Sequence, residues 1–488
     1  MHDPFQDLRP LAGTYATALA GEAFSRGLAT TSADGTRNPI TPGATPVVLP
    51  TQVIAERHAL AQTLATAGFR MAQATVLGPS REVLLGALSP LERRLIERTA
   101  PRTRRLAIAR IDFLVSTRPA ALELNATIPA MPGYSDMAAG AFLSVVGRAA
   151  GLDEAEIRQL VAENGSNVEA LHRALVTASL QERGRPPERI AVLCRRNDSQ
   201  LSEVDHLVAR FGELGTEAHR VYPDEASGGE LFTAHGKTFD FVYRHLFVHR
   251  LAETPQPFLE AFFAGEAAPG SLLFNRPAAH VEAKSNFALL SRTLEDPSLA
   301  AGAGLGPDEL EAIRRAVPWT RALAPGPTRG PAGEAVPDLV AHVAAHPEGF
   351  VLKRAWDYGG KAVFVGPASD EPGFATRSEA AFGARLSWPE LVRRAAADPR
   401  GGGFVVQAVV DLPRERHLLA TPGGAVEADV FVDYSAFASV GLEPEPAWGG
   451  VVRASASRIV NIQGGGGVLP LLSESVWAKL GRALRAES

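Results

Sequence analysis

Apolar residues recur with helical spacing over residues 51–78, and this pattern predicts a long amphipathic helix. A second helix is predicted over residues 89–98, where Ser89 stands at the cap position and Pro90 in the first turn. Residues 1–50 are rich in Gly, Pro and Thr and show little periodicity. They predict an irregular arm in front of a helical scaffold.

Two short apolar runs, 106–115 and 119–125, are separated by a polar turn and predict an antiparallel strand pair. Helical spacing returns over 135–182 and ends in the breaker run RGRPPE. From there strand, helix, strand and strand patterns follow one another, which is typical of a small α/β layer. We therefore expect a scaffold region with one strand pair at 51–185 and an α/β lobe at 186–300.

The sequence pattern changes at residue 301 and again at residue 338. Residues 301–337 are rich in Ala, Gly and Pro around one short helical pattern and predict a connector. Residues 338–488 contain a run of strand patterns, typical of antiparallel sheet, and end in a helical pattern. The fold class expected from this order is α+β.

Size and charge narrow the class of protein. A chain of 488 residues exceeds one hydrophobic core, so two or three lobes are expected. With 49 Lys and Arg against 54 Asp and Glu, the net charge of -5 gives no bias toward nucleic acid or anionic membrane, and a small-molecule partner is expected instead. No apolar run approaches 18 residues, and the first residues lack the features of a signal peptide, so we expect no membrane partner and a cytoplasmic protein.

The single cysteine, Cys194, lies in an apolar run and predicts buried strand packing, with a catalytic thiol as the alternative.

Polar residues alternate with apolar ones on the predicted strand pair. Arg110 and Asp112 are two apart on one strand, and Glu123 and Asn125 are two apart on the next, so each pair shares a face. If the strands pair on that face, three oxygen ligands and one guanidinium converge. Hard oxygen ligands suit Mg²⁺ beside a nucleotide, and the absence of His and Cys argues against zinc. The alternative is an ordinary hairpin with a polar solvent face.

After Asn125 come a Pro-x-Met loop and Ser135, and the whole segment resembles the closing stretch of D-alanine:D-alanine ligases. Glutathionylspermidine synthases and circularly permuted ATP-grasp proteins carry a similar arrangement. The resemblance implies that Asp112, Glu123 and Asn125 bind Mg²⁺, that Arg110 meets the charge of the transferred phosphoryl group or of the tetrahedral intermediate, and that Ser135 lies near substrate.

This segment lies near the front of the chain, whereas it closes the D-alanine:D-alanine ligases. The resemblance therefore implies a circularly permuted ATP-grasp fold, with the α/β layer as an inserted pre-ATP-grasp lobe and the nucleotide lid within 338–488. In such a fold residues 110–125 lie beside the strand pair at 350–365, despite their separation in sequence.

The expected lid follows the strand that contains Lys353. Gly359, Gly360 and Lys361 stand between that strand and the next, where glycines allow close approach to phosphate and lysines supply charge. The segment resembles the ATP-grasp lid, with Lys353 as the phosphate lysine; a plain hairpin with a Gly-Gly turn is the alternative.

Other positions complete the resemblance. It implies that Gln407 leads into the adenine hinge, that Glu415 holds the ribose hydroxyls, and that Arg453 faces the acceptor or the phosphate. Lys284 resembles the earlier nucleotide-contacting lysine, with a solvated surface lysine as the alternative.

The implied activity is that of a carboxylate–amine ligase. ATP and Mg²⁺ are the implied cofactors, and the implied substrates are a small-molecule carboxylate and an amine or peptide, joined through an acyl phosphate. The alternatives are a phosphotransferase of the same fold and a nucleotide-binding or scaffold protein without turnover.

Overall fold

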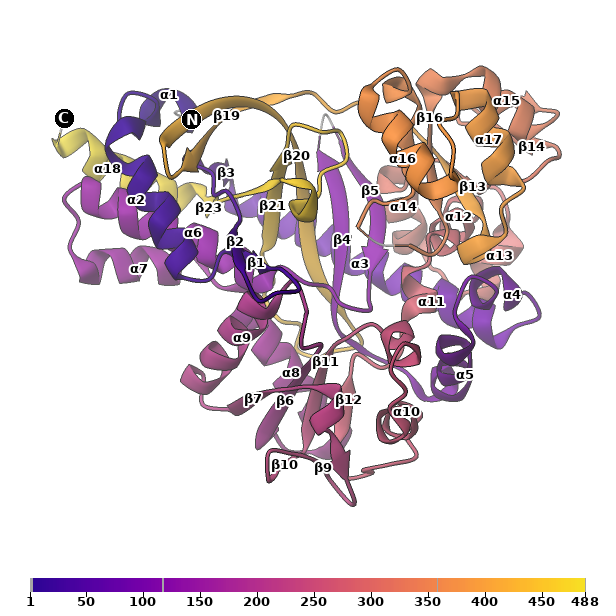
Figure 1. Cartoon of the computed structure of the whole chain (residues 1–488), viewed down its shortest axis with the longest axis horizontal. Helices are drawn as coiled ribbons and strands as arrows, with labels where there is room; N and C mark the ends of the chain where they lie inside the picture. The colour runs from indigo at the N-terminus through magenta and orange to yellow at the C-terminus, as the bar shows by residue number, and fades with distance from the viewer. Residues whose placement is uncertain (1–2, 116–117, 358, 488) are drawn as a thin grey trace.

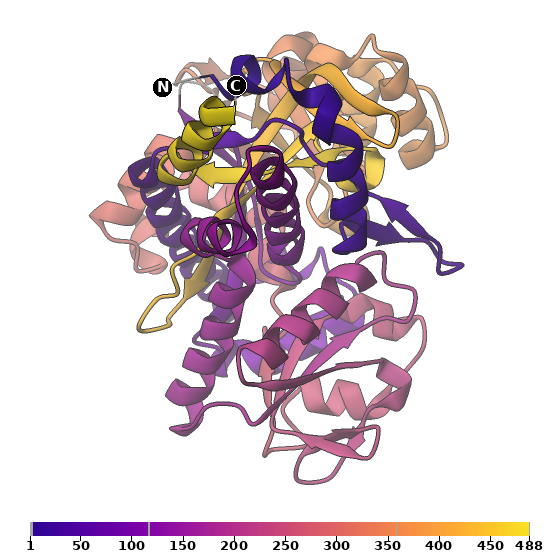
Figure 2. The same ribbon diagram turned by 90° about the vertical axis from the view of Figure 1, so that its left-hand side faces the viewer.

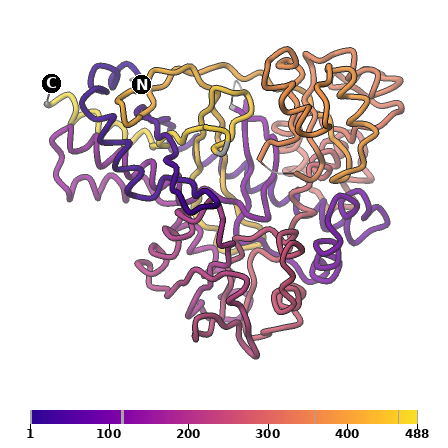
Figure 3. Tube along the Cα trace, in the orientation of Figure 1, coloured from indigo at the N-terminus to yellow at the C-terminus, as the bar shows by residue number. Residues whose placement is uncertain are grey.

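The computed structural model describes residues 3–115, 118–357 and 359–487. A central six-stranded sheet carries two lobes, each built on a four-stranded sheet (Figure 1). In Figure 1 the α/β lobe lies below the central sheet and the other lobe at its upper right. The two ends of the chain lie at the same end of the molecule, as the Cα trace shows (Figure 3).

The central sheet is antiparallel, with the strand order β22-β21-β20-β4-β5 and with β19 paired to β20. The predicted strand pair is confirmed as its β4–β5 hairpin. The strands of this sheet are β4 (Leu106–Val115), β5 (Pro119–Asn125), β19 (Glu415–Thr421), β20 (Gly424–Val440), β21 (Gly450–Ser455) and β22 (Gly467–Leu469).

Hydrophobic cores form on both faces of the central sheet. Because side chains alternate along a strand, Ile111 and Phe113 of β4 pack in the core under the long helix α3, while Phe437 and Val451 join the core of α2, α6 and α8. Figure 2 shows helices on both sides. The helices of the chain up to residue 183, together with the C-terminal helix, are α1 (Pro4–Leu8), α2 (Ala12–Ser25), α3 (Thr51–Leu77), α4 (Glu82–Leu85), α5 (Pro90–Thr99), α6 (Pro132–Ala149), α7 (Glu154–Asn164), α8 (Asn167–Arg183) and α18 (Glu474–Glu487).

The predicted helices of the scaffold are confirmed. The helix expected at 51–78 is α3, and the one expected at 89–98 is α5, which begins with a capping box between Ser89 and Glu92. The helical spacing over 135–182 corresponds to α6, α7 and α8.

The α/β lobe has a parallel sheet with the order β12-β11-β6-β7, which confirms the predicted α/β layer. Cys194 at the end of β6 is buried in its core, as expected of strand packing. The elements are β6 (Arg189–Cys194), α9 (Leu201–Glu213), β7 (Glu217–Val221), β8 (Ser227–Gly228), β9 (Phe232–Ala234), β10 (Lys237–Phe239), β11 (Phe241–His245), α10 (Pro257–Phe263) and β12 (Leu272–Phe274).

The other lobe has an antiparallel sheet, β13-β18-β16-β17, over a core that includes Phe364, Phe374 and Phe404. Its strands and helices, with those that connect it to the rest, are α11 (Ala279–Glu282), α12 (Lys284–Arg292), α13 (Pro297–Gly302), α14 (Pro307–Ala316), β13 (Thr320–Ala322), β14 (Thr328–Arg329), β15 (Ala335–Val336), α15 (Leu339–Ala345), β16 (Phe350–Arg354), β17 (Val363–Val365), α16 (Pro372–Phe382), α17 (Trp388–Ala396) and β18 (Phe404–Ala408).

The structure corrects three details of the predicted elements. The expected irregular arm at 1–50 contains the regular helix α2, whose buried residues Ala12, Ala16, Leu19 and Ala23 follow a helical period too poor in large side chains to stand out. This region also contains β1 (Ala29–Thr31), β2 (Arg37–Pro39) and β3 (Val47–Leu49), and β3 pairs with β23 (Leu471–Ser473).

The second correction is that residues 301–337, expected to connect, also supply β13 to a sheet. The third is that residues 458–462, which belong to the run of strand patterns expected after residue 338, form bends and the start of a 3-10 turn. The strands after residue 338 also divide among three sheets, since residues 409–414 carry the chain from β18 to β19 in the central sheet and β23 pairs with β3.

Candidate active site

Four polar residues of β4 and β5 share one face of the central sheet. Arg110 lies opposite Asn125, and Asp112 lies opposite Glu123. The residue between them on β4, Ile111, points into the core under α3. The predicted convergence of these four side chains is therefore confirmed.

A β-bulge shapes the edge of this face. The register shifts after Asp112, so that Glu123 and Ala121 are paired and Leu122 between them is not. As a consequence Leu122 and Glu123 both line the same cavity. A bulge re-aims side chains and frees backbone groups from the ladder, and here the carbonyl of Leu122 accepts a hydrogen bond of 3.1 Å from Nζ of Lys353.

Two arginines and two aspartates form a buried chain of ion pairs across β4, β20 and β21. Arg110 donates to Asp112 from Nε at 2.7 Å and from Nη2 at 2.9 Å. Arg453 donates from Nη2 to the same carboxylate at 3.0 Å, and from Nε to Asp433 at 3.0 Å. Positive and negative side chains therefore alternate in the order Arg110, Asp112, Arg453 and Asp433. This alternation balances the charges in a site with little solvent.

Asp433 is a member of this group that the sequence analysis missed. It lies directly opposite Arg453 in the β20–β21 register. The available signal was its position as an isolated acid in the apolar run 430–440 of a strand. A buried carboxylate needs a partner, and that rule would have marked Asp433 as a candidate.

The pKa values within the chain of ion pairs diverge. Burial alone raises the pKa of Asp112, but Arg110 and Arg453 outweigh it, and the pKa falls well below its ordinary value. Burial raises the pKa of Asp433 to about 6, against the attraction of Arg453. For Arg453 burial lowers the pKa, yet Asp433 and Asp112 together raise it further. Asp112 is thus the firmly ionised acid of the two.

Lys353 lies across the cavity, on β16 of the neighbouring lobe. Besides Leu122, its Nζ donates to Oε1 of Gln407 at 2.8 Å, and Nε2 of Gln407 donates to Oγ1 of Thr320 at 3.1 Å. Burial lowers the pKa of Lys353 to about 8, while Glu123 acts in the opposite direction. Residues 110–125 and 350–365 therefore meet, as the sequence predicts, across 231 residues of chain in the Lys353–Leu122 contact.

Lys284 begins α12 and is buried, so the surface-lysine alternative does not describe its position. Its backbone N–H donates to the carbonyl of Ala355 at 2.8 Å, and its Nζ donates to the carbonyl of Asp357 at 2.9 Å. The same Nζ lies 3.4 Å from Oε2 of Glu123. Lys284 thus joins the face of β5 that carries Glu123 to the loop after β16.

The glycine loop between β16 and β17 includes Tyr358, which lies outside the described residues. Gly359 and Gly360 have φ angles of 71° and 70°, a region in which side chains are strained. Nδ2 of Asn461 donates to the carbonyl of Gly359 at 2.8 Å, and a Cβ at Gly360 would come within 2.9 Å of Ile459. The loop therefore packs closely on residues 458–462.

These groups surround a cavity of about 310 Å³ between the central sheet and the two lobes. The α/β lobe contributes Ser199, Gln200 and Phe247. The sequence-predicted residues that line the cavity are Arg110, Asp112, Glu123, Asn125, Lys284, Lys353, Gly359, Gly360, Lys361, Gln407 and Arg453.

Ser135 and Glu415 do not line this cavity. Ser135 is buried in α6, where its Oγ donates to the carbonyl of Gly450 at 2.7 Å and accepts from Asn167 at 3.3 Å. Glu415 begins β19 and lines a second cavity with Arg57 and Tyr434. The structure thus brings together the residues expected to bind metal, to act in catalysis and to form the lid, while the expected substrate residue and ribose residue lie elsewhere.

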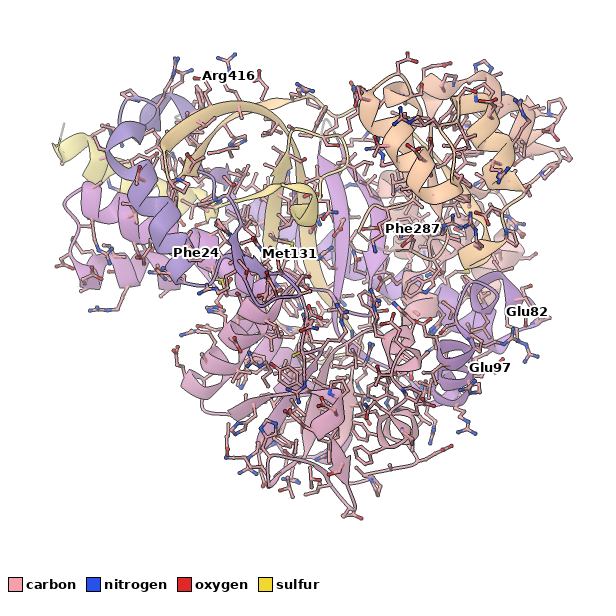
Figure 4. All side chains as sticks on the ribbon, in the orientation of Figure 1. Phe24, Glu82, Glu97, Met131, Phe287 and Arg416 are labelled. Carbon is pink, nitrogen blue, oxygen red and sulfur yellow. The ribbon has the colours of Figure 1, made fainter. Side chains whose placement is uncertain are left out.

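Glu203 of α9, which the sequence analysis did not single out, joins the α/β lobe to Arg110. Nη1 of Arg110 donates to the carbonyl of Ala130 at 2.8 Å. The next residue, Met131, has a φ of 91°, and its N–H and that of Gly133 donate to Oε1 of Glu203 at 2.7 and 3.0 Å. Met131 is labelled near the middle of the molecule in Figure 4. Burial raises the pKa of Glu203 to about 7.

The donor set on β4 and β5 fits Mg²⁺ by its chemistry. Asp112, Glu123 and Asn125 offer hard oxygen atoms on one wall of the cavity. Nδ2 of Asn125 is buried and has no hydrogen-bond partner among the described residues, so no contact through that nitrogen fixes the orientation of the amide. Over the same residues no group of three or more His, Cys, Asp and Glu side chains is placed to hold a metal.

Comparisons with known proteins rest on structure alone, because no family model and no curated protein matches the sequence. A glutathione synthetase-like effector from Globodera pallida, GSS30, solved without ligand, superposes with a TM-score of 0.57 at 12% identity. The superposition covers 97% of this chain and 98% of GSS30. The two chains share a fold.

The fold shared with GSS30 agrees with the expected α+β class, while the circularly permuted ATP-grasp arrangement stays a prediction. A candidate gamma-glutamylcysteine synthetase from Methylobacillus flagellatus KT superposes at 13% identity over 91% of this chain and 99% of that one. Its TM-score of 0.39 is too low to show a shared fold.

None of the helices in the described ranges has the length and apolar character to cross a membrane.

Proposed function

We propose that this chain is an ATP- and Mg²⁺-dependent ligase that joins a carboxylate to an amine. The observation that carries the proposal is that one cavity has the oxygen donors Asp112, Glu123 and Asn125 on one wall, and Lys353 with the glycine loop on the facing wall. The shared fold with a glutathione synthetase-like protein supports it.

The charge of the cavity also supports an anionic ligand. Basic side chains outnumber acidic ones along its described lining, and an excess of positive charge in a partly enclosed site raises the local concentration of anions. The basic residues are Arg110, Lys284, Lys353, Arg354, Lys361, Arg453 and Arg458, and the acidic residues are Asp112, Glu123, Glu282, Asp357 and Asp433.

In the proposed reaction a carboxylate oxygen attacks the γ-phosphorus of ATP, and the bond to ADP breaks. The amine then attacks the acyl carbon, phosphate leaves, and the amine loses a proton. Lys353 and the glycine loop hold the phosphates, while Arg110 and Arg453 face the developing negative charge. Mg²⁺ bound by the three oxygen donors would neutralise phosphate charge.

The experiment incubates the protein with ATP, MgCl₂ and pools of carboxylic acids and amines, and detects products by mass. The expected result is an adduct lighter than the sum of an acid and an amine by one water, with one ADP per adduct. A phosphorylated acid released without adduct would support the phosphotransferase instead. ATP binding without any product would support a nucleotide-binding protein without turnover.

Glu123→Gln is the matched test of the oxygen donors. Gln keeps the size of the side chain and removes the negative charge, so turnover is expected to be lost while the protein stays folded. Glu427→Gln on β20 is the control, because Glu427 lies in exposed ion pairs with Arg9 and Arg416. Turnover of the Glu123 variant at the wild-type rate would remove the magnesium assignment.

A further inference from the structure

A second cavity, of about 340 Å³, lies on the face of the central sheet that carries Tyr434 and Val452. Arg453, the neighbour of Val452 on β21, lines the first cavity instead. The second cavity is enclosed by the first described residues of the chain, β3, the start of α3 and the β19–β20 hairpin. The proposed ligase reaction does not use this second cavity.

Arg57 of α3 is the cation of this cavity. Its guanidinium lies 4.5 Å from the centre of the Tyr434 ring, and burial lowers its pKa. Within the described chain it makes no hydrogen bond or ion pair, although a half-buried guanidinium is normally paired. Stacking on an aromatic ring uses the face of the guanidinium and leaves the N–H groups at its edge for a carboxylate.

Three carboxylates line the same cavity: Asp3, which accepts from the N–H of Phe5, Asp433, which is bound by Arg453, and Glu415. Oε2 of Glu415 lies 3.5 Å from Nε2 of His417, whose Nδ1 lies 3.1 Å from Oγ1 of Thr45. The charge of Glu415 raises the pKa of Arg57, so the two side chains attract each other, yet they form no direct ion pair. Opposite charges therefore border the cavity without neutralising each other at contact.

Arg416 and Tyr434 are two further polar residues that line the second cavity. Arg416, labelled at the outer edge beside β19 in Figure 4, lies 3.5 Å from Glu427 and 3.7 Å from Asp429, so its charge is already balanced. The Tyr434 hydroxyl is buried and has no hydrogen-bond partner among the described residues. Burial raises its pKa to about 12, so it remains protonated at neutral pH and is available as a donor.

We propose that this second cavity binds a small zwitterion, an α-amino acid, with its carboxylate on Arg57 and its ammonium group on Glu415. A simple anion would occupy Arg57 and not Glu415, and a simple amine would occupy Glu415 and not Arg57. The volume lies in the range of ordinary small-molecule sites. The proposal concerns binding alone and does not depend on the ligase reaction.

Calorimetry tests the proposal with the protein in the absence of ATP and magnesium. The probes are glycine and L-glutamate as zwitterions, acetate as a carboxylate alone, and ethylamine as an amine alone. Both zwitterions are expected to bind, and each at least about tenfold more tightly than acetate or ethylamine. Failure of both zwitterions to bind into the millimolar range, or equal binding of acetate and glycine, would overturn the proposal.

Variants then locate the binding. Arg57→Gln and Glu415→Gln are each expected to weaken glycine binding at least about tenfold, and Arg57→Lys, which keeps the charge and loses the fork, is expected to weaken it less. Arg9→Gln is the control, since Arg9 is an exposed arginine beside Phe5 that does not line the cavity.

Lys353→Met separates this cavity from the first, because Lys353 lines the first cavity and not the second. Binding that survives in Lys353→Met and is lost in Arg57→Gln supports the second cavity. Binding that is lost in Lys353→Met and kept in Arg57→Gln belongs to the proposed ligase site and overturns the inference. Melting curves of the two variants confirm that each compared protein is folded.

Discussion

Nη2 of Arg453 donates a hydrogen bond of 3.0 Å to Oδ2 of Asp112, and 341 residues separate the two in the chain. The contact joins β21 to the β4–β5 strand pair, which carries the proposed magnesium ligands. Because Asp433 holds the other side of Arg453, the position of this guanidinium depends on two carboxylates at once.

Asp433→Ala is expected to destabilise the protein by about 3 kcal/mol, because Nε and Nη2 of the buried Arg453 lose the carboxylate that accepts their hydrogen bonds. The measurement is the shift in melting temperature at pH 7.5. Asp429→Ala on the same strand is the control: its carboxylate is exposed and lies 3.7 Å from Arg416, so a change within about 0.5 kcal/mol is expected. Equal shifts for both variants would contradict the buried pair.

Lys353→Met is expected to weaken ATP binding by about 1.5 to 3 kcal/mol, because phosphate oxygens lose a charged donor while the side chain keeps its volume. Calorimetry with ATP and MgCl₂ gives the affinity. Lys479→Met removes a lysine whose ion pair with Glu163 is on the surface, and it should leave the affinity unchanged. An unchanged affinity in Lys353→Met would remove the lid assignment.

The dependence of nucleotide affinity on magnesium gives a third prediction. In the wild-type protein, EDTA is expected to weaken ATP binding, because Mg²⁺ neutralises phosphate charge beside Asp112 and Glu123. In Glu123→Gln the effect of EDTA should be several-fold smaller, because one of the three oxygen donors has lost its charge. Titrations with and without EDTA on both proteins measure the difference, and an equal effect of EDTA on both would place the metal elsewhere.

Glu203 predicts how stability changes with pH. Burial raises its folded-state pKa from 4.5 to about 7, so the folded state holds a proton that the unfolded state has released between these values. The contribution of Glu203 to the free energy of unfolding is therefore fully present below pH 4.5 and is lost as the pH rises to 7. The loss is about 3 kcal/mol. Glu203→Gln mimics the protonated acid and keeps an oxygen for the N–H groups of Met131 and Gly133.

The Gln variant should thus be less sensitive to pH between 5 and 8 than the wild-type protein, and more stable at pH 8. Melting curves across this range measure the effect. Glu213→Gln, on the same helix but exposed, should retain the wild-type pH profile. A Glu203→Gln profile parallel to the wild type would show that this carboxylate does not titrate in the expected range.

Local patterns predicted the parts of the site that depend on neighbours in sequence. The period-two alternation placed Arg110 with Asp112, and Glu123 with Asn125, and the short turn between the strands paired them. The hairpin of Lys353 could be predicted in the same way, because β16 and β17 pair across one loop.

Local sequence patterns could not predict which residues reach the site through contacts between segments far apart in the sequence. Asp433 reaches the site because β20 pairs with β4 across more than 300 residues, and Glu203 reaches Met131 from another lobe. Glu415 was expected near the nucleotide from its order after Gln407, but the chain leaves the β18 sheet between them and enters the central sheet. Register and lobe changes of this kind depend on tertiary packing, not on local periodicity.

The position of β4 between β5 and β20 has a consequence during synthesis of the chain. Ribosomes add about 5 to 20 residues per second, so β4 and β5 exist for tens of seconds before β20 and β21 are made. Through that interval one edge of β4 has unpaired backbone groups and alternating buried residues, the form that promotes association with other chains. Nascent or truncated chains that end before β20 are therefore expected to aggregate and to need a chaperone, whereas the complete chain covers this edge itself.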